Sequence, residues 1–435
     1  MTDGPERPTD RDTAASDTAG PGTEPGTAPS GPATPSSPVV SVKRSVAVAG
    51  AMFLMAMSAA GPGFISQTGT FTAKYGPSFA AAIVASVVID LAIQLNVWRV
   101  IGLSGMRAQD LANRVLPYSG HVLAFLVVVG GLVFGIGNIS AAGLGLHDAF
   151  GIDTRVGAVL SAVLAIVIFN YRALEGTIDR AVIVLGVLKI VLIAIVAVVT
   201  APPIGEAAVR TVAPIGLDLL PVLTLIGGTV GGYITYAGAH RLIESGTTGP
   251  ENLRTISRGS VNGILVTGVL RILLFLGILG AVAAGAQLSK ADPAGSAFSF
   301  ALGPVGLHLF GVVLWTAGMT STIGASFTSA SFLRTLSPAV DRRFSLTISA
   351  FITVCTVAFL VIGQAPSSLL VFAGAFNGLI LPVGLALILW IAWRRRDLLG
   401  GIRQPAWMLV LGLAAFVFTV YAGVESIALI PSIFR

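Results

Sequence analysis

Polar side chains occur inside apolar stretches of this chain that are long enough to form membrane-spanning helices. They gather after Gly61-Pro62-Gly63 and around the glycine-rich run 227–232, and single amides occur in two further stretches. Hydroxyls, amides and backbone groups can bind a small polar solute, although they supply no negative charge. The candidate solute-binding residues are Gln67, Thr68, Thr70, Thr72, Asn138, Gly231, Gly232, Tyr233 and Asn377.

Three of these candidates, Gly231, Gly232 and Tyr233, are predicted to start the second half of an interrupted helix. A helix start carries free backbone amides and a partial positive charge, which favour an anionic group such as a carboxylate. Hydroxyls and amides also form hydrogen bonds between the helices of membrane bundles. From the residues alone, each polar candidate is therefore either a solute ligand or a structural contact.

Asp90 is the only acidic residue near the centre of an apolar stretch. A charged side chain inside a bilayer is costly, so such residues are usually functional or paired with another charge. The possible partners are Lys189 and Arg271, which also lie within apolar stretches. Asp90 is predicted to be either a coupling site for a proton or a sodium ion, or one half of a structural ion pair.

Two interruptions of the helical pattern would position these residues. Pro62 removes a backbone donor and clashes with the preceding turn, and each glycine of 227–232 costs a helix about 1 kcal/mol relative to alanine. The interruptions fall five spans apart, so the two halves of the chain would be inverted in the membrane. This arrangement is typical of secondary transporters with a solute site near the midplane. Alternatively, the proline only kinks a helix and the glycines only pack.

The composition predicts an all-α membrane protein. Hydrophobic residues make up 54% of the chain and charged residues 11%, against roughly 25% charged residues in soluble proteins. Apolar stretches of this length cross lipid as helices because lipid offers the backbone no hydrogen-bond partner. The eleven predicted spans are 45–72, 77–100, 121–146, 154–171, 179–201, 215–244, 256–286, 299–332, 344–363, 367–393 and 405–430.

The predicted organisation is a short tail followed by one membrane domain. Residues 1–42 are rich in Pro, Gly, Thr and Ser and lack the apolar core of a signal peptide, so they are predicted to be a disordered cytoplasmic tail. The transporter domain would cover 43–435. Its parts are repeat one at about 45–201, repeat two at about 215–393 and an extra helix at about 405–430.

The positions of the 26 Lys and Arg residues predict the orientation. Most of them fall in segments on the same side as the tail, whereas the opposite segments hold only Lys74, Arg155, Arg210, Lys290 and Arg435. Basic residues are enriched in cytoplasmic loops. We therefore expect a multi-pass protein of the cell membrane with a cytoplasmic N-terminus and an outside C-terminus.

Three motifs resemble those of the NRAMP (natural resistance-associated macrophage protein) family of divalent metal transporters, over about residues 45–430. Its GPGF sequence is similar to Gly61-Pro62-Gly63-Phe64. Its Q…R-x-x-G…G-x-DLA signature is similar to Gln94-x4-Arg99-x2-Gly102-x2-Gly105-x4-Asp110-Leu111-Ala112. Its LGP…AGxSSTI sequence is similar to Leu302-Gly303-Pro304 with Ala317-Gly318-Met319-Thr320-Ser321-Thr322-Ile323. The resemblance implies a LeuT-type fold, in which two inverted five-helix repeats surround broken helices 1 and 6. It also implies transport of a divalent metal.

The metal ligands of that family are missing at the matching positions. Aligned from GPGF, the family's DPGN motif falls on Thr72-Ala73-Lys74-Tyr75, and its MPH motif falls on Gly231-Gly232-Tyr233. Transition metals bind carboxylate, imidazole or sulfur donors in place of water. The residues therefore predict a divergent branch of the family whose solute is a small polar organic molecule, for example a carboxylate. Metal transport remains what the resemblance implies.

The LeuT-type fold also implies a candidate site for a coupling ion. In that fold a sodium ion lies between carbonyls of span 1 and hydroxyls of span 8, and the resemblance places Thr320, Ser321 and Thr322 at this depth. The alternative is that these hydroxyls bond to carbonyls of their own helix.

Other function classes lack their sequence signatures. The chain has no GxxxxGK[ST] loop, no HExxH motif and no Ser/His/Asp set, so neither ATP hydrolysis nor enzyme activity is expected. A channel would need a continuous polar stripe or a ring of charges. The predicted partners are a small solute, a coupling ion (proton or sodium) and the lipid bilayer. No nucleic acid, nucleotide or cofactor is expected.

Overall fold

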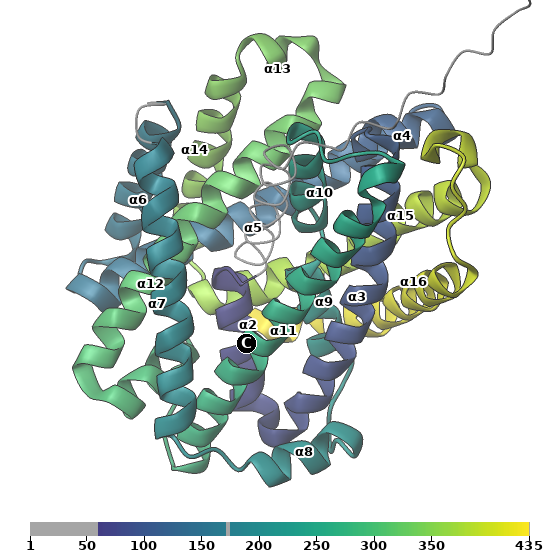
Figure 1. Ribbon diagram of the computed structural model, residues 1–435. Helices are drawn as coiled ribbons and strands as arrows, with labels where there is room; N and C mark the ends of the chain where they lie inside the picture. Colours follow the sequence, from purple (N-terminus) through teal and green to yellow (C-terminus); the bar gives the residue numbers. More distant parts are fainter. Residues whose placement is uncertain (1–59, 171–174, 435) are drawn as a thin grey trace, which may run out of the picture. The chain divides into compact units, whose positions relative to one another are not determined.

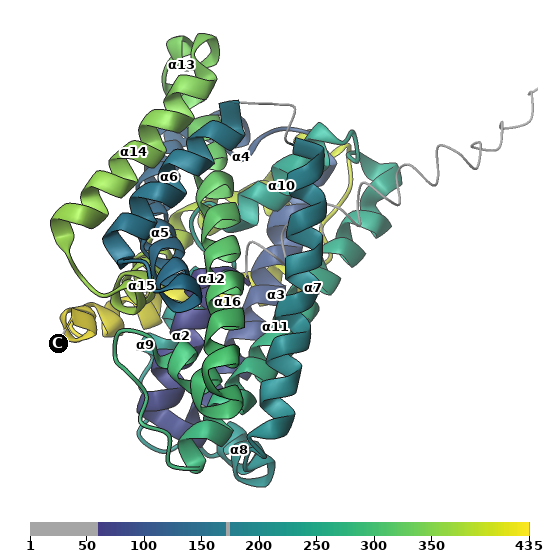
Figure 2. The same cartoon turned by 90° about the vertical axis from the view of Figure 1, so that its left-hand side faces the viewer.

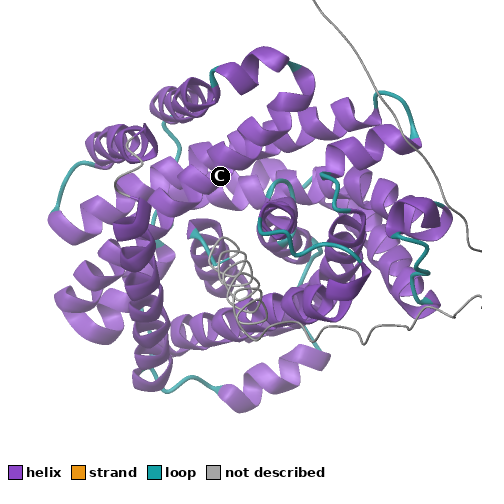
Figure 3. Ribbon diagram, turned by 45° about the horizontal axis from the view of Figure 1, so that its top comes forward, coloured by secondary structure: helices purple, strands orange, loops and turns teal. Residues whose placement is uncertain are grey.

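The computed structural model describes residues 60–170 and 175–434, and every regular element in these ranges is a helix (Figure 3). The predicted tail and the first part of the first predicted span lie outside the described residues. Eight helical stretches within the described ranges are long and apolar enough to cross a membrane, and nine if a strongly bent pair counts as one span. The all-α membrane class predicted from composition is confirmed.

The first half of the bundle runs from α2 to α8 (Figure 1). α2 (Pro62–Tyr75) descends to a turn at Gly76, where φ is 52°, and α3 (Phe79–Ser104) returns beside it. Helices α7 and α8 form the bent pair, at an angle of 102°. The remaining elements of this half are η1 (Gly76–Ser78), α4 (Ala108–Val115), α5 (Ser119–Phe150), α6 (Thr154–Asn170), α7 (Glu175–Val199) and α8 (Ile204–Val212).

The second half contains the other interrupted span, formed by α9 (Leu220–Thr229) and α10 (Ile234–Glu244). Each predicted span coincides with a helix of the structure, the first of them only from Pro62 onward. The remaining elements are η3 (Pro250–Asn252), α11 (Leu253–Ala283), α12 (Pro293–Leu336), α13 (Pro338–Arg342), α14 (Phe344–Ile362), α15 (Pro366–Arg394), η4 (Arg396–Leu399), α16 (Ala406–Ile427) and η5 (Ile430–Phe434).

The eighth span contains a kink that the sequence did not predict. Within α12, Gly303 has φ 65° and ψ −159°, and Pro304 follows it, so the helix is divided by a kink at this point. A positive φ is readily available only to glycine. Proline has no amide to donate to the helix, and its ring clashes with the preceding turn. The predicted span 299–332 lies within α12 and crosses this kink.

The two ends of the bundle carry different short helices. Figures 1 and 2 both show α4 and α13 at one end and α8 at the other. The first two lie in segments predicted to be cytoplasmic, and α8 lies in a segment predicted to be outside. The arrangement of the helices therefore agrees with the alternation of sides that the basic residues predict.

Glycines bring helices into close contact, both between the two halves and within the second half. A methyl group on Gly145 of α5 would lie 2.3 Å from the backbone nitrogen of Trp315 in α12. A methyl group on Gly227 of α9 would lie 1.9 Å from the carbonyl oxygen of Gly374 in α15. Small residues allow such backbone approach in membrane bundles. As a result, the interrupted α9–α10 span is held against α15 through backbone atoms.

Candidate solute site at the two helix breaks

The sixth span is interrupted where its glycines predict. α9 ends at Thr229 and α10 begins at Ile234, and Gly232 between them has φ 53°. The amides of Val230 and Gly231 both donate to the carbonyl of Ile226, at 2.9 and 3.2 Å, so the helical ladder stops there. Backbone groups near this turn are thus not all committed to a helix.

The described part of the first span begins at the equivalent place. Gly61 is extended, with φ −71° and ψ −169°, and Pro62 is the first residue of α2. Proline at this position needs no hydrogen-bond partner and its φ suits the helix. α2 therefore starts at the predicted break, and its first-turn amides point back toward Gly61.

Gln67 connects α2 to the sixth span and to α15. Its side chain is fully buried, and its Nε2 donates to the carbonyl of Leu370 at 3.3 Å. A methyl group on Gly228 would lie 2.4 Å from Gln67 Oε1, and one on Gly374 would lie 2.3 Å from Nε2. The amide is therefore enclosed by two glycines, and its Oε1 has no hydrogen-bond partner among the described residues.

Asn377 approaches the same break from α15. Its Nδ2 donates to the carbonyls of Ala373 at 2.8 Å and Gly130 at 3.2 Å. Its Oδ1 has no hydrogen-bond partner in the described ranges and lies against Gly232, where a methyl group would come within 1.8 Å. Asn377 therefore fastens α15 to α5 with its donor and leaves an acceptor beside the turn.

Tyr233 and Asn138 complete this group on the side of α5. The Tyr233 ring packs edge-on against Phe134, with centroids 5.8 Å apart, and its hydroxyl lies close to the Asn138 side chain. Asn138 Nδ2 has no hydrogen-bond partner in the part of the chain that the structure describes. We name the set Gln67, Asn138, Tyr233 and Asn377 the central polar group; each is at most 2% exposed. In this structure the group is closed to solvent.

The other candidates from the sequence lie at or near this group but differ in their bonding. Thr68 donates to the carbonyl of Phe64 at 2.7 Å and Thr72 to that of Thr68 at 2.6 Å, so both hydroxyls are used within α2. Thr70 Oγ1 is buried and has no such partner among the residues described. Because the Gly231 amide already bonds to Ile226, the predicted free amides of the second half-helix would be those of Gly232 and Tyr233.

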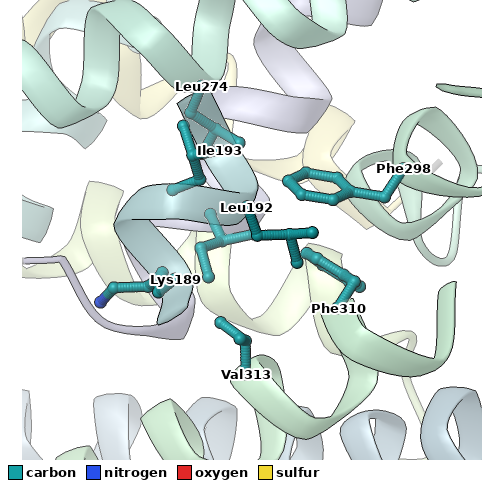
Figure 4. A pocket seen from close by; sticks show the side chains of 8 residues that line it. Lys189, Leu192, Ile193, Leu274, Phe298, Phe310 and Val313 are labelled. Atoms are coloured by element: carbon teal, nitrogen blue, oxygen red, sulfur yellow. The ribbon is translucent and has the colours of Figure 1, made fainter. Parts of the chain in front are cut away.

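Lys189 of α7 lies at the start of α2. Its Nζ donates to the carbonyl of Ala60 at 2.8 Å, while its carbon chain lines a small apolar cavity of about 10 Å³. Figure 4 shows the amino nitrogen directed away from the rings of Phe298 and Phe310. The lysine thus binds the unwound backbone of span 1, which the sequence did not predict, rather than Asp90.

Arg271 of α11 lies between the two broken helices. Its Nη1 donates to Thr229 Oγ1 at 3.0 Å, at the end of α9, and its guanidinium carbon is 4.8 Å from the Phe64 ring centroid, in the first turn of α2. Asp90 of α3 is near enough for its charge to interact with Arg271. Neither Asp90 oxygen has a hydrogen-bond partner among the described residues.

The hydroxyls proposed for a sodium ion have mixed bonding. Thr320 donates to the carbonyls of Thr316 at 3.0 Å and Ala317 at 3.1 Å, within its own helix. Ser321 is buried, and Thr322 Oγ1 is buried without a hydrogen-bond partner in the described ranges. The one described span-1 carbonyl ahead of the break, that of Ala60, already accepts the Lys189 amine.

Some contacts of the site were not predicted from sequence. Gly228, Gly374 and the Leu370 carbonyl enclose Gln67, and Phe64 and Phe134 carry the aromatic contacts. The glycines around Gln67 had a usable sequence signal, because close approach of two helices needs small residues in the facing spans. Phe64 was noted only as the last residue of the Gly61-Pro62-Gly63-Phe64 motif, which did not predict its contact with Arg271.

The fold and the polar group at its breaks define a membrane transporter of the LeuT-type fold. Similar solved structures include the manganese transporter of Eremococcus coleocola in complex with an aromatic bis-isothiourea compound, with a TM-score of 0.72 and 18% identity over 92% of this chain and 89% of that one. MhsT in complex with L-phenylalanine is also similar, with a TM-score of 0.58 and 16% identity over 89% of this chain and 98% of that one.

The family assignment follows from the sequence comparison. The natural resistance-associated macrophage protein-like family model matches residues 52–429, so the chain belongs to this family. It is 45% identical to the uncharacterized membrane protein YcsG of Bacillus subtilis, over 87% of this chain and 93% of that protein. It is also 45% identical to an uncharacterized membrane protein of Haemophilus influenzae, over 90% of this chain and 98% of that protein.

Proposed function

We propose that this protein is an ion-coupled secondary transporter whose central polar group binds a small polar organic solute. The observation that carries the proposal is the convergence of α2, the α9–α10 turn, α5 and α15 on buried polar atoms without partners among the described residues. Buried polar groups are usually hydrogen-bonded, so orphaned atoms at a helix break favour a ligand site. Because the group is closed to solvent, solute entry requires the helices to move.

The family membership favours a divalent metal as the alternative solute, and one similar solved structure is a manganese transporter. The donor set here supports an organic solute instead. Within the described ranges there is no cluster of three or more His, Cys, Asp and Glu residues that could hold a metal ion. The central polar group offers amides and a phenol, which do not replace the water shell of a transition metal well.

The register of the first break adds to this argument. The family motif DPGN shares its central Pro-Gly with Gly61-Pro62-Gly63-Phe64, and α2 starts at Pro62. Thr72, where the alignment from GPGF puts the metal-binding Asp, lies instead in the last turns of α2. In a second register, with the Pro-Gly of the family motif set on Pro62-Gly63, the two ligand positions hold Gly61 and Phe64. Neither side chain can bind a metal, so both alignments support the same conclusion.

Uptake into proteoliposomes tests the proposal. We expect the purified protein to accumulate a small polar organic solute, selected first by its stabilisation of the protein against heat. Manganese, iron and magnesium form the parallel arm. Accumulation of a divalent metal, with no organic solute transported, would show that the donor argument is wrong while leaving a transporter. The absence of any uptake by folded protein would contradict the function itself.

The coupling ion is proposed to be a proton carried by Asp90. Asp90 is 1% exposed, and its carboxylate lies beside Arg271 and the last residue of α9, at the break. A sodium ion at the span-1 carbonyls would compete with the Lys189 amine for Ala60. A proton therefore explains the observed contacts better, and the Thr320, Ser321 and Thr322 site remains the sodium alternative.

Asp90→Asn should abolish the dependence of uptake on an imposed proton gradient, because asparagine has the same shape but cannot exchange a proton. Downhill exchange of the solute across the membrane should persist in this variant. The measurement is uptake with and without a pH or sodium gradient. Wild-type dependence on both gradients in Asp90→Asn would remove this residue from coupling, and a sodium requirement retained in the variant would favour the span-8 hydroxyls.

The protein is proposed to lie in the cell membrane with its N-terminus in the cytoplasm. The excess of basic residues in segments at the end of α4 and α13 supports this orientation. Alkaline phosphatase fused after Arg435 should be active in whole cells. An inactive fusion, together with a fluorescent cytoplasmic one, would reverse the orientation.

A further inference from the structure

We propose that Arg271 is the residue that binds the carboxylate group of an anionic solute, at the point where the two broken helices meet. This inference rests on the transporter function proposed above and specifies its substrate class. The central polar group would then hold the remainder of the solute.

One edge of the Arg271 guanidinium has no partner in the part of the chain that the structure describes. Arg271 is 1% exposed, and within that part its one hydrogen bond runs from Nη1 to Thr229. Its Nε and Nη2 have no partner among the described residues. These two nitrogens form the side of the guanidinium plane whose parallel N–H groups match the two oxygens of a carboxylate. The two nitrogens without a partner are thus the pair that can donate to both oxygens of one carboxylate.

The position of this edge is that of a transporter site. Thr229 is the last residue before the turn of the sixth span, and Phe64 lies in the first turn of α2. Arg271 contacts both, so its guanidinium adjoins both breaks. The start of α2 contributes a partial positive charge to the same region. The Arg271 guanidinium and the start of α2 therefore both favour an anionic ligand.

Asp90 does not satisfy the arginine in this structure. Arg271 Nη1 donates to Thr229 Oγ1, and the same hydroxyl lies close to the Asp90 carboxyl. No direct hydrogen bond joins Arg271 to Asp90 among the described residues, and Nε and Nη2 stay without a partner there. An ion pair of two buried groups offsets its desolvation only with direct, well-formed hydrogen bonds, so this arrangement argues against a purely structural pair.

The local charge favours an anion over a cation. Among the described residues near the start of α2, the buried charged groups are Arg271, Lys189 and Asp90, so cations exceed acids. Repulsion between like charges is strong where the surroundings exclude water. A divalent metal would add two positive charges to this region, whereas a carboxylate would balance it.

The test compares carboxylates with their uncharged amides on the purified full chain. The probes are acetate, L-lactate, pyruvate, benzoate and succinate, each beside its amide, and manganese chloride. We expect at least one carboxylate, and not its amide, to raise the unfolding midpoint of the wild type. Arg271→Lys keeps a positive charge but loses the fork, so affinity for that carboxylate should fall about 10- to 100-fold.

Arg99→Lys is the matched control. Arg99 is a buried arginine of α3 whose Nε donates to Gln404 and whose Nη1 donates to Ser257, both at 3.0 Å. Its replacement should not change the preference for carboxylate over amide, whatever it does to stability. That preference is the readout that a merely structural role of Arg271 would not move.

Three results would overturn the inference. The first is equal stabilisation of the wild type by carboxylates and amides, or by no carboxylate at all. The second is wild-type carboxylate affinity in Arg271→Lys. The third is uptake of manganese or an uncharged solute that Arg271→Lys leaves intact; in that case the protein is still a transporter, and only carboxylate recognition fails.

Discussion

Gly227→Ala should destabilise the whole bundle. The added methyl group would lie 1.9 Å from the carbonyl oxygen of Gly374, 2.4 Å from the amide nitrogen of Gly378 and 2.9 Å from its Cα. All three are backbone atoms of α15, so α9 and α15 must separate. Overpacking typically costs about 1–3 kcal/mol, which exceeds the gain of up to about 1 kcal/mol from replacing glycine in a helix.

The measurement is the apparent unfolding midpoint of purified protein at one fixed heating rate, since large proteins often unfold irreversibly. Gly324→Ala is the control, because Gly324 lies inside α12 and a methyl group there meets no atom within 4 Å. Its midpoint should equal that of the wild type or exceed it slightly. If Gly227→Ala and Gly324→Ala unfold at the same temperature, the close α9–α15 approach is incorrect.

Gly228→Ala, one residue further on, should strongly reduce transport while leaving the protein folded. Its methyl group would lie 2.4 Å from Gln67 Oε1 and 2.7 Å from Nε2. These atoms are the end of a flexible side chain, which can move aside at low cost in stability. The movement takes the Gln67 amide out of the central polar group and weakens its bond to the Leu370 carbonyl.

We expect uptake by Gly228→Ala to fall at least about tenfold, the equivalent of one hydrogen bond to a solute of about 1.4 kcal/mol. Its unfolding midpoint should stay close to that of Gly324→Ala, which should transport normally. Normal uptake by Gly228→Ala would exclude Gln67 from solute binding. Loss of folding would show instead that Gln67 is a packing residue, the alternative left open by the sequence.

Local physics made the membrane class and the two interruptions predictable from sequence. A 20-residue apolar stretch can only be helical in lipid. A Gly-Pro-Gly sequence such as 61–63, or a run with four glycines in six residues such as 227–232, interrupts a helix wherever it occurs. The kink at Gly303-Pro304 had the same kind of signal, but it was not predicted because the apolar stretch runs across it. These features need no knowledge of distant contacts.

The candidate site could be predicted only in part. Gln67, Asn138, Tyr233 and Asn377 were recognisable because polar side chains in apolar helices are costly, and the structure brings all four to one place. Sequence could not separate Gln67 from Thr68 and Thr72. All three are polar residues of one helix, and only the fold shows that the two threonines bond within α2 while Gln67 faces Gly228 and Gly374.

The charged residues show most clearly what sequence determined and what tertiary structure decided. Sequence alone determined that Asp90, Lys189 and Arg271 lie within apolar spans, since this follows from hydropathy. It did not determine their partners, because residues so far apart in sequence meet only when α3, α7 and α11 pack around the breaks. The structure assigned Lys189 to the Ala60 carbonyl and placed Arg271 between Thr229 and Phe64. Partner choice depends on distances across the bundle, which no local pattern encodes.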